Sequence, residues 1–476
     1  MCNLYESLIE YARQDIYPMH MPGHKRNQDF HMDNPYFFDV TEVEGMDDLY
    51  HPVGILKYSM EHIARMYGAE KSFLLINGST AGILAAVSAC CRRGQTVLMA
   101  RNCHKSVYHA AFLLELEQKY IYPSFVTGTQ IVTGITKEDV ALALEKTQNV
   151  KCVVLTSPTY EGFVSDLSEI SSFLHEQGIP LIVDEAHGAH LRWNAVFPES
   201  AVEAGADLVI QSAHKTLPSL TQTAVLHYQS TLVSEEEVRR FLGIYQTSSP
   251  SYVLMASVDR CYMWLQEEGK AAFEAYVKRL RRFYKRMHSL KTLRLLSGEK
   301  RDPSKIVVLT AGSGITGPEL TRCLREEYKI ETEMELSDYV IAMTSVADSE
   351  QGFRRLENAL LKIDGELVGR EVEKGEGEKR YIEAEYYCNA YEAVYCEGKE
   401  RLIHKAAGEI SKEYVYVYPP GVPVVIPGEK LNDSMIEYLL RQQESGCELR
   451  GLKDGEGRKI EVIRDKNCIL NKERRR

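Results

Sequence analysis

The chain lacks the sequence features of export, membrane insertion and nucleic-acid binding. Its first residues, MCNLYESLIEYARQD, do not show the basic-then-apolar order of a signal peptide. The longest run of small apolar residues, 81–91, is well below the ~18 residues that a membrane span needs. A formal net charge of −11 argues against a generally basic surface for nucleic acid. We expect a cytoplasmic protein that binds neither membranes nor nucleic acid.

Cysteine pairs with the spacing of a redox or zinc motif are also missing. None of the 11 cysteines forms a CxxC pair, and Cys90, Cys91 and Cys152 lie in apolar surroundings. This pattern favours reduced, buried thiols over a disulfide framework or a zinc site. We therefore expect no metal centre.

Short apolar runs alternate with helical patterns from about residue 70. The runs are SFLLI, TVLMA, KCVVLTS, PLIVDE, ADLVIQS and QTAVLHY, at residues 72–76, 96–100, 151–157, 180–185, 206–212 and 222–228. Stretches with helical periodicity, such as residues 80–93 and 165–178, lie between several of them. Continuous apolar strands alternating with helices predict a mostly parallel sheet covered on both faces. Ligands of such sheets bind at the carboxyl ends of the strands.

A length of 476 residues suggests two to four domains. We expect an N-terminal arm at 1–55 that begins with a short amphipathic helix, and a large domain at 56–290 that ends in a long helical region. A small α/β domain at 291–363 and a charged, glycine-rich linker at 364–380 follow. A C-terminal α+β domain at 381–476 completes the chain, and its prolines between residues 414 and 431 predict an extended, turn-rich path.

Lys215 stands just after the apolar run ADLVIQS, at the end of a predicted buried strand. Lysine is almost never left fully buried without a partner or a function. A desolvated lysine has a depressed pKa and becomes a nucleophile, notably for Schiff-base chemistry. The alternative is a loop lysine whose ammonium reaches water.

Asp184 ends the predicted strand PLIVDE, 31 residues before Lys215, which is about one strand–helix–strand excursion. Both groups should therefore lie at the same edge of the sheet. A buried carboxylate needs a cationic partner, and the protonated ring nitrogen of pyridoxal phosphate is one such partner. The alternative role for Asp184 is a helix N-cap.

A phosphate site and a stacking side chain are predicted at the same edge. Gly78, Ser79 and Thr80 lie between a strand and a helix, where the backbone can approach an anion and the helix N-terminus favours it. His104 follows the TVLMA run and could lie against a pyridine ring, while Ser212 could bond the phosphate. Each feature alone is weak, because Ser and Thr are ordinary N-caps and histidine is often a surface residue.

The order of phosphate loop, stacking histidine, aspartate and lysine resembles pyridoxal phosphate enzymes of the aspartate aminotransferase fold. The segments MPGHKR, TEVEGMDDLYHPVG, NGSTAG, RNCHKS, VDEAHGAH, SAHKTLPSLTQTA, TSSPSY and YPPGVPVVIPGE together look like the bacterial ornithine/lysine/arginine decarboxylases. The likeness runs from about residue 18 to about residue 430. It implies a mostly parallel three-layer α/β sheet of fold type I and the cofactor pyridoxal 5'-phosphate.

The resemblance also implies roles for individual residues. Lys215 would form the Schiff base, Asp184 would bond the pyridine nitrogen, and His214 or Lys215 would return a proton to the substrate carbon. The residues expected to bind the cofactor are Gly78, Ser79, Thr80, His104, Asp184, Ala186, His187, Ser212, His214, Lys215, Thr247 and Ser248. Of these, the segment of Thr247 and Ser248 is expected to reach the phosphate in a neighbouring subunit.

The implied reaction is decarboxylation of a small basic amino acid. Arginine to agmatine in polyamine biosynthesis is our first choice, with lysine or ornithine as alternatives. The acids that could bind the distal cation of the substrate are Glu44, Asp47, Asp48 and Glu429. The PGHK motif begins by residue 22, which leaves no room for the N-terminal wing domain of the large inducible members. We therefore expect a homodimer or higher homo-oligomer with shared active sites.

Three rival hypotheses remain open. Gly312-x-Gly314-x-x-Gly317 with Glu331 matches a dinucleotide fingerprint, although Pro318 suggests that the helix begins too late and that this is a turn. An aminotransferase or another lyase of the same fold would keep the cofactor, and Arg354 or Arg355 could bind an α-carboxylate. A catalytically dead relative is the third hypothesis, and the intact pair of Asp184 and Lys215 argues against it.

Overall fold

A computed structural model describes residues 3–369, 382–418, 421–444 and 448–465 of the chain. Most of the predicted linker and tail therefore lies outside the described residues. In the part that is described, no helix combines the length and apolar character needed to cross a bilayer.

A seven-stranded sheet forms the centre of the large domain, in the order β2-β8-β7-β6-β5-β3-β4. Its strands are β2 (Lys71–Leu75), β3 (Thr96–Ala100), β4 (Glu117–Ile121), β5 (Val150–Thr156), β6 (Leu181–Asp184), β7 (Leu208–Gln211) and β8 (Ala224–Tyr228). β8 runs antiparallel to both of its neighbours, and the pairs among β4, β3, β5, β6 and β7 are parallel. The prediction of a mostly parallel sheet is confirmed.

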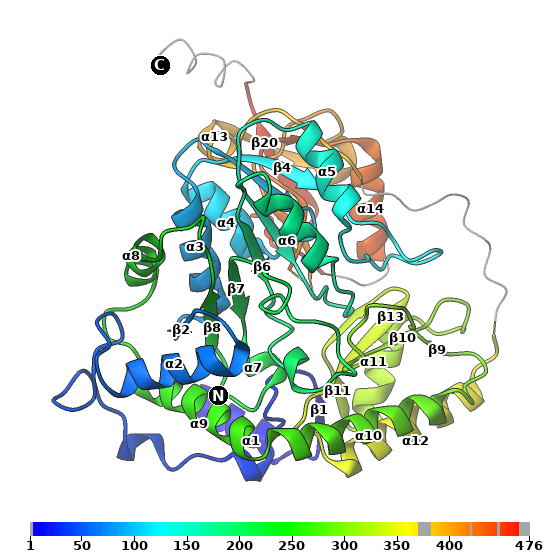
Figure 1. The fold of residues 1–476 in the computed structure, drawn as a ribbon. Coiled ribbons are helices and arrows are strands. Elements are labelled where there is room, and N and C mark those ends of the chain that lie inside the picture. The colour runs from blue at the N-terminus through cyan, green and yellow to red at the C-terminus, as the bar shows by residue number, and fades with distance from the viewer. Residues whose placement is uncertain (1–2, 370–381, 419–420, 445–447, 466–476) are drawn as a thin grey trace.

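The predicted apolar runs all form strands of this sheet because helices cover both faces. The large-domain helices are α2 (Ile55–Tyr67), α3 (Gly78–Cys90), α4 (Lys105–Leu113), α5 (Lys137–Glu145), α6 (Leu167–His175), α7 (Ala213–Thr216) and α8 (Glu235–Tyr245). α3 packs on α4 and α8, while α5 packs on α6 on the other side of the sheet (Figure 1). The central side chains of β5, such as Val153 and Val154, are accordingly buried.

Strand β4 is the one member of this sheet that the apolar pattern did not predict. Its sequence EQKYI is polar, and only Gln118 and Ile121 are buried. β4 lies at the edge of the sheet, where polar side chains are tolerated and a run of apolar residues is not required.

The long helical region at 235–290 consists of α8 followed by α9 (Tyr252–Glu267) and α10 (Gly269–Met287). Ser251 caps the N-terminus of α9 by accepting a bond from the Leu254 amide. α10 extends under the small domain beside α12 (Glu350–Glu366), as Figure 1 shows. Arg286 of α10 forms an ion pair of 2.9 Å with the buried Glu357 of α12, so the two helices bind the large domain to the small one.

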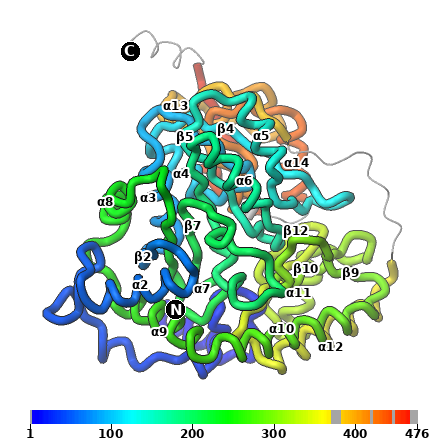
Figure 2. The backbone as a smooth tube through the Cα atoms, viewed as in Figure 1, coloured from blue at the N-terminus to red at the C-terminus, as the bar shows by residue number. Residues whose placement is uncertain are grey.

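The N-terminal arm contains α1 (Leu4–Arg13), β1 (Tyr17–Met19) and two short 3-10 helices, η1 (Gln28–Phe30) and η2 (Pro35–Phe37). Figure 2 shows the arm, in blue, running along the lower edge of the large domain before it enters α2. β1 pairs in parallel with β11 (Ile330–Thr332) of the small domain. The arm thus contacts both domains.

The small domain holds the helix α11 (Gly317–Glu326) and a four-stranded sheet in the order β12-β13-β10-β9. The strands are β9 (Arg294–Leu295), β10 (Lys305–Leu309), β12 (Met334–Leu336) and β13 (Tyr339–Met343). Every pair in this sheet is antiparallel, so the strand–helix pattern of the sequence does not form a parallel unit.

The dinucleotide hypothesis is wrong for this reason. Gly317 begins α11, Gly312 and Gly314 have positive φ in the turn that precedes it, and β10 has no parallel neighbour. A Cβ at Gly317 would lie 1.9 Å from the Leu336 carbonyl oxygen, which explains the glycine by packing within the small domain. Glu331 forms an ion pair of 3.1 Å with Arg325.

In its described residues, the C-terminal part has small sheets, two α-helices and one 3-10 helix. Its strands are β14 (Glu385–Tyr386), β15 (Gly398–Leu402), β16 (Val415–Tyr418), β17 (Pro423–Val425), β18 (Glu429–Lys430), β19 (Glu448–Arg450) and β20 (Lys459–Ile463). Its helices are α13 (Ala390–Tyr395), η4 (Ile403–Lys405) and α14 (Asp433–Glu444). A separate apolar core that includes Val415, Leu439 and Val462 supports the predicted α+β character. The boundaries of all the domains stay predictions.

The cysteines follow the prediction in part. Cys90, Cys91, Cys103, Cys152, Cys261, Cys323 and Cys388 are free thiols. Cys396 is disulfide-bonded, so the expectation of reduced thiols is wrong at this position.

A chain of buried polar side chains crosses four adjacent strands. Glu185, directly after β6, accepts a bond of 2.6 Å from the Gln211 amide of β7, and Gln211 Oε1 lies 3.1 Å from Nε2 of His227 on β8. Nδ1 of His227 lies 2.8 Å from the Ser72 hydroxyl of β2. Burial lowers the pKa of His227 to about 3, so this ring stays neutral in the folded protein.

The buried His227 predicts a loss of stability in acid. The unfolded chain takes up a proton as pH falls through about 6.5, whereas the folded ring does not until about 3. The stability present above pH 6.5 is therefore lost as pH falls, by about 1.4 kcal/mol at pH 5.5 for this one histidine. We expect the free energy of unfolding in urea to fall less between pH 8 and pH 5.5 in His227→Gln than in the wild type, and the difference to be about 1.4 kcal/mol. The exposed His404→Gln is the control, and equal drops in all three proteins would contradict the expectation.

Candidate functional site

A cavity of about 770 Å³ opens at the carboxyl ends of β5, β6 and β7. Most of the predicted cofactor residues line it, namely Gly78, Ser79, Thr80, His104, Asp184, Ala186, His187, Ser212, His214 and Lys215. Residues of the small domain and of α14 line it too, among them Tyr339, Glu437 and Tyr438. The structure therefore brings together side chains that are far apart in the sequence.

Lys215 lies in the short helix α7, which directly follows β7. Its Nζ is 3.1 Å from Nε2 of His187. Burial lowers the pKa of the Lys215 ammonium, and the Asp184 carboxylate offsets part of this effect. A lysine with a lowered pKa loses its proton more readily, and the neutral amine then has the free lone pair that a nucleophile needs.

Asp184 is the last residue of β6 and is only 4% exposed. Its Oδ1 accepts a bond of 3.2 Å from the Ala186 amide. Burial raises the pKa of Asp184, whereas Lys215 lowers it. No cation of the described residues comes within ion-pair distance of this carboxylate. A buried acid of this kind suits a cationic ring nitrogen supplied by a ligand.

The N-terminus of α3 faces the same cavity. Its N-cap, Asn77, makes no side-chain capping bond, and Gly78 adopts a φ of 73° that lets the chain turn into the helix. The hydroxyls of Ser79 and Ser212 meet at 2.6 Å between α3 and the end of β7. Two hydroxyls and the free amides of a helix start are donors that suit a phosphate group.

Two neutral histidines complete the wall around Lys215. His104 caps α4, with its Nδ1 accepting a bond from the Ser106 amide, and burial and Lys215 lower its pKa to about 3. His214 holds its Nδ1 2.8 Å from the Thr223 carbonyl oxygen, and burial lowers its pKa to about 4. Nδ1 of His214 must carry the proton that this carbonyl accepts, which leaves Nε2 as a base.

The PGHK motif, residues 22–25, contacts the loop that carries Lys215. The Gly23 amide donates a bond of 2.6 Å to the His214 carbonyl, and a Cβ at Gly23 would lie 2.5 Å from the Leu217 carbonyl oxygen. Lys25 is buried and donates to the carbonyls of His20 and Met343, at 2.6 and 2.7 Å. The motif therefore joins the arm, the lysine loop and the small domain, a role that the sequence did not suggest.

The remaining predicted residues do not line the cavity. Thr247 and Ser248 are exposed, and the Thr247 amide donates to Asn77 Oδ1 at 3.2 Å. Asp47 accepts bonds from the amides of Val53 and Gly54, just before α2. Their contribution to a neighbouring subunit's site stays a prediction.

The other three acids proposed for the substrate cation are also absent from the cavity lining, and their surroundings differ. Glu44 is exposed, and Asp48 accepts a bond of 2.7 Å from the Tyr50 amide. Glu429 is buried and forms an ion pair of 3.6 Å with Arg101. Arg101 also donates to the carbonyls of Pro423 and Val424, so this pair ties the C-terminal domain to the large domain.

The arginines of the aminotransferase hypothesis lie elsewhere on the surface. Arg354 pairs with Glu350 at 3.0 Å, and Arg355 pairs with Asp15 at 3.0 Å. Neither is among the residues that line the cavity.

Several cavity residues escaped the sequence reasoning. The segment Thr159–Tyr160–Glu161 follows β5, so the rule that ligands bind at strand ends could have found it. The Tyr160 ring lies 4.6 Å from the His187 ring, and its hydroxyl donates to Glu333 at 2.7 Å. Residues of α14 carried no such signal, because only the tertiary fold brings them to the cavity.

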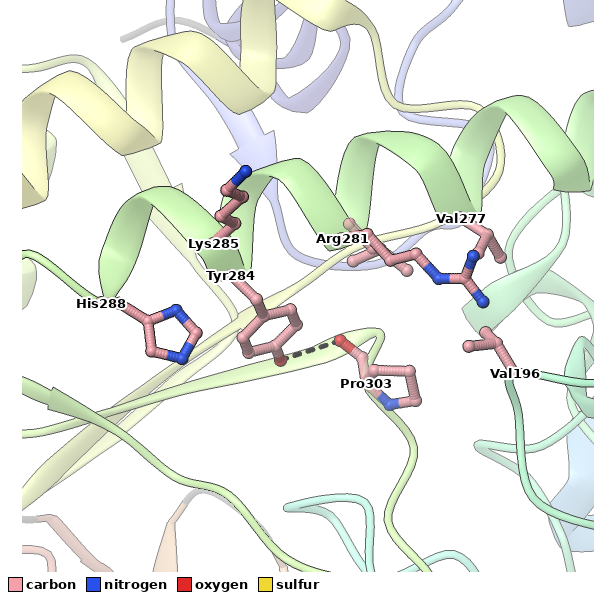
Figure 3. A pocket seen from close by; sticks show the side chains of 8 residues that line it. Val196, Val277, Arg281, Tyr284, Lys285, His288 and Pro303 are labelled. Carbon is pink, nitrogen blue, oxygen red and sulfur yellow. Dashed lines mark hydrogen bonds between the residues drawn. The ribbon is translucent and has the colours of Figure 1, made fainter.

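A buried cluster also links the small domain to His187. Lys305 Nζ lies 3.0 Å from Asp302 Oδ2 and 3.5 Å from the His187 carbonyl oxygen, and His190 Nε2 lies 3.2 Å from the same Asp302 oxygen. A second hollow, of about 230 Å³, lies near this cluster between α10 and Pro303, and Tyr284 donates to the Pro303 carbonyl at 2.9 Å (Figure 3). None of the predicted site residues lines this second hollow.

Two family models match the chain. The Orn/Lys/Arg decarboxylase major domain matches residues 2–343, and the C-terminal domain of the same family matches residues 382–464. Bacillus subtilis YaaO is 34% identical, with 92% of this chain and 93% of that protein covered. A Bacillus subtilis protein named arginine decarboxylase is 30% identical, with 98% of each chain covered.

A solved structure confirms the fold. The constitutive lysine decarboxylase of Escherichia coli superposes with a TM-score of 0.78 at 20% identity, which covers 92% of this chain and 76% of that one. The fold, the cavity at the sheet edge and both family matches agree, and the chain belongs to the Orn/Lys/Arg decarboxylase family.

Proposed function

We propose that this protein decarboxylates arginine to agmatine with bound pyridoxal phosphate, as a step of polyamine biosynthesis. The observation that carries the proposal is the presence of buried Asp184 and half-buried Lys215 in one cavity, beside the hydroxyls of Ser79 and Ser212. The family membership favours a basic amino acid, and relatives over nearly the full chain are named arginine decarboxylase.

The cavity fits the cofactor at each of its functional groups. Ser79, Thr80, Ser212 and the first amides of α3 would hold the phosphate, and Lys215 would be the point of covalent attachment. Asp184 would hold the ring nitrogen in its protonated form, and the neutral His104 would lie against the ring. When bound, the cofactor supplies the electron sink for the pair left behind by carbon dioxide.

The protein's own groups orient the substrate and handle its protons. The rings of Tyr160 and His187 contact each other beside Lys215, and they would restrict the position of the substrate α-carbon. Once carbon dioxide has left, this carbon needs a proton to become the product amine. Lys215 Nζ as an ammonium group and His214 after its Nε2 has taken up a proton are the candidate donors, because burial lowers the pKa of both groups and makes their protonated forms stronger acids.

We also propose that the chain acts as a homodimer, or a higher homo-oligomer, with shared sites. Large apolar side chains are exposed along the arm and the start of α2: Tyr36 at 94%, Phe37 at 87%, Val53 at 85% and Tyr58 at 59%. Exposed apolar side chains of this size favour contact with another protein surface. Asp47 and the Thr247 segment lie in the same region, since the Tyr50 hydroxyl donates to the Thr247 carbonyl.

We also propose a cytoplasmic location for the protein.

Product analysis tests the reaction. The purified holoenzyme is offered arginine, lysine and ornithine in turn, and released carbon dioxide and amine are measured together. We expect equal amounts of carbon dioxide and agmatine from arginine and much slower release from the other two. A keto acid in place of carbon dioxide would show an aminotransferase, and cadaverine or putrescine as the main amine would move the assignment to lysine or ornithine.

A further inference from the structure

The acids that line the cavity are few. Among the described residues they are Glu161, Asp184 and Glu437. Asp184 lies beside Lys215 and is suited to the cofactor ring. Glu437 is exposed on α14. Glu161 is the remaining one, and it is only 6% exposed although it carries an acidic group.

Glu161 is held in a fixed orientation. It follows β5, and its Oε1 accepts a bond of 2.7 Å from the hydroxyl of Tyr339. Tyr339 begins β13 of the small domain, is 1% exposed and lines the same cavity. A carboxylate on the large domain is thereby positioned by a side chain of the small domain, in the wall that both share.

The Glu161 carboxylate has no cation of its own. In the part of the chain that the structure describes, no lysine, arginine or histidine nitrogen comes within ion-pair distance of it. The arginine near it is Arg301, which directs its guanidinium to the backbone carbonyls of Glu161, Leu296 and Lys305. A buried acid without a cation costs free energy that a ligand cation would offset.

Glu161 and Lys215 lie on opposite sides of β6 in the order of the chain segments, since Glu161 follows β5 and Lys215 follows β7. Both line one cavity of about 770 Å³, so an extended basic side chain held near Lys215 can direct its distal end toward Glu161. Glu429, by contrast, is already paired with Arg101.

We propose that the Glu161 carboxylate, oriented by Tyr339, binds the cationic group at the distal end of the substrate and so sets the preference for a basic amino acid. This inference rests on the proposed function and names the specificity residue of that site. The planar guanidinium of arginine can donate two bonds to one carboxylate, which favours it over the point charge of lysine.

Binding of agmatine to the holoenzyme tests the assignment without turnover. Agmatine keeps the guanidinium and lacks the carboxylate, so its affinity in equilibrium dialysis reports the distal contact. Glu161→Gln keeps an acceptor for the Tyr339 hydroxyl and removes only the charge. We expect agmatine to bind this variant at least about 30-fold more weakly, with a matching rise in KM for arginine and a smaller change in kcat.

Two further variants separate the charge from the structure around it. Tyr339→Phe removes the orienting bond and leaves the charge, and we expect about fivefold weaker agmatine binding. Glu437→Gln removes the other acid of the cavity wall. Thermal unfolding and the cofactor absorbance of each variant establish that it is folded and loaded.

Failure of the Glu161 assignment can be distinguished from failure of the proposed reaction. Agmatine affinity in Glu161→Gln within threefold of the wild type overturns the assignment. A loss in Glu437→Gln without one in Glu161→Gln, or no agmatine binding by the wild type, overturns it as well. A wild type that binds agmatine through Glu161 but releases no carbon dioxide from arginine overturns the proposed reaction alone.

Discussion

The Lys215→Ala variant is expected to lose at least about 10⁴-fold in turnover of arginine and to lack the yellow absorbance of the wild type. Covalent attachment and proton transfer at the substrate carbon would both be missing. The neighbouring His187 cannot replace the amine, because burial holds its pKa well below the usual range and its Nε2 is not a primary amine. Carbon dioxide release at saturating arginine measures the loss.

A matched control strengthens this result. Lys105 lies next to His104 in the sequence but is exposed and does not line the cavity. Lys105→Ala should keep both the absorbance and the turnover of the wild type. Borohydride should abolish the absorbance of the wild type and fix the cofactor to a peptide that contains Lys215. A yellow, active Lys215→Ala enzyme would refute the proposed chemistry.

The second large effect is expected at Asp184. In Asp184→Ala the ring nitrogen would lose its anionic partner in a buried site. Breaking a buried charge pair costs about 3–5 kcal/mol, which corresponds to a loss of about 10²- to 10⁴-fold in turnover at 1.36 kcal/mol per factor of ten. Cofactor affinity should fall with it, and titration of the apoenzyme with pyridoxal phosphate measures this second effect.

Asp184→Asn shows whether the charge or the shape matters. Asparagine can still accept the bond from the Ala186 amide, which Asp184 holds at 3.2 Å, but it carries no charge. We expect its turnover to be close to that of Asp184→Ala. Turnover near the wild type in either variant would refute the role assigned to this carboxylate.

The sequence predicted the parts of the fold whose signal is local. Each buried strand of the central sheet contains a short, mostly apolar run, and each motif at a strand end is contiguous, so Lys215, Asp184 and Ser79 could be found together. β4 was missed because an edge strand keeps polar residues. The antiparallel order of the small sheet was missed because a strand–helix–strand pattern does not reveal the direction in which strands pair.

The far wall of the cavity could not be predicted for a different reason. It consists of β13, α14 and the start of β17 with the residue before it, each of which reaches the sheet edge through the packing of separate domains. Glu429 looked available in the sequence, yet Arg101, hundreds of positions earlier, is its partner. Glu161 was not among the acids predicted for the substrate cation; its place after β5 was a signal that went unused, whereas its burial beside Tyr339 is visible only in the structure.

The junction at Gly23 and Lys25 has a consequence for how the enzyme matures. The loop that presents the reactive amine receives a bond from the arm, and the arm is fastened in turn to the small domain through the Met343 carbonyl. A nascent polypeptide can complete this three-way joint only after residue 343 has left the ribosome. The loop that carries Lys215 thereby gains its support from the arm and the small domain only after most of the chain has been synthesised.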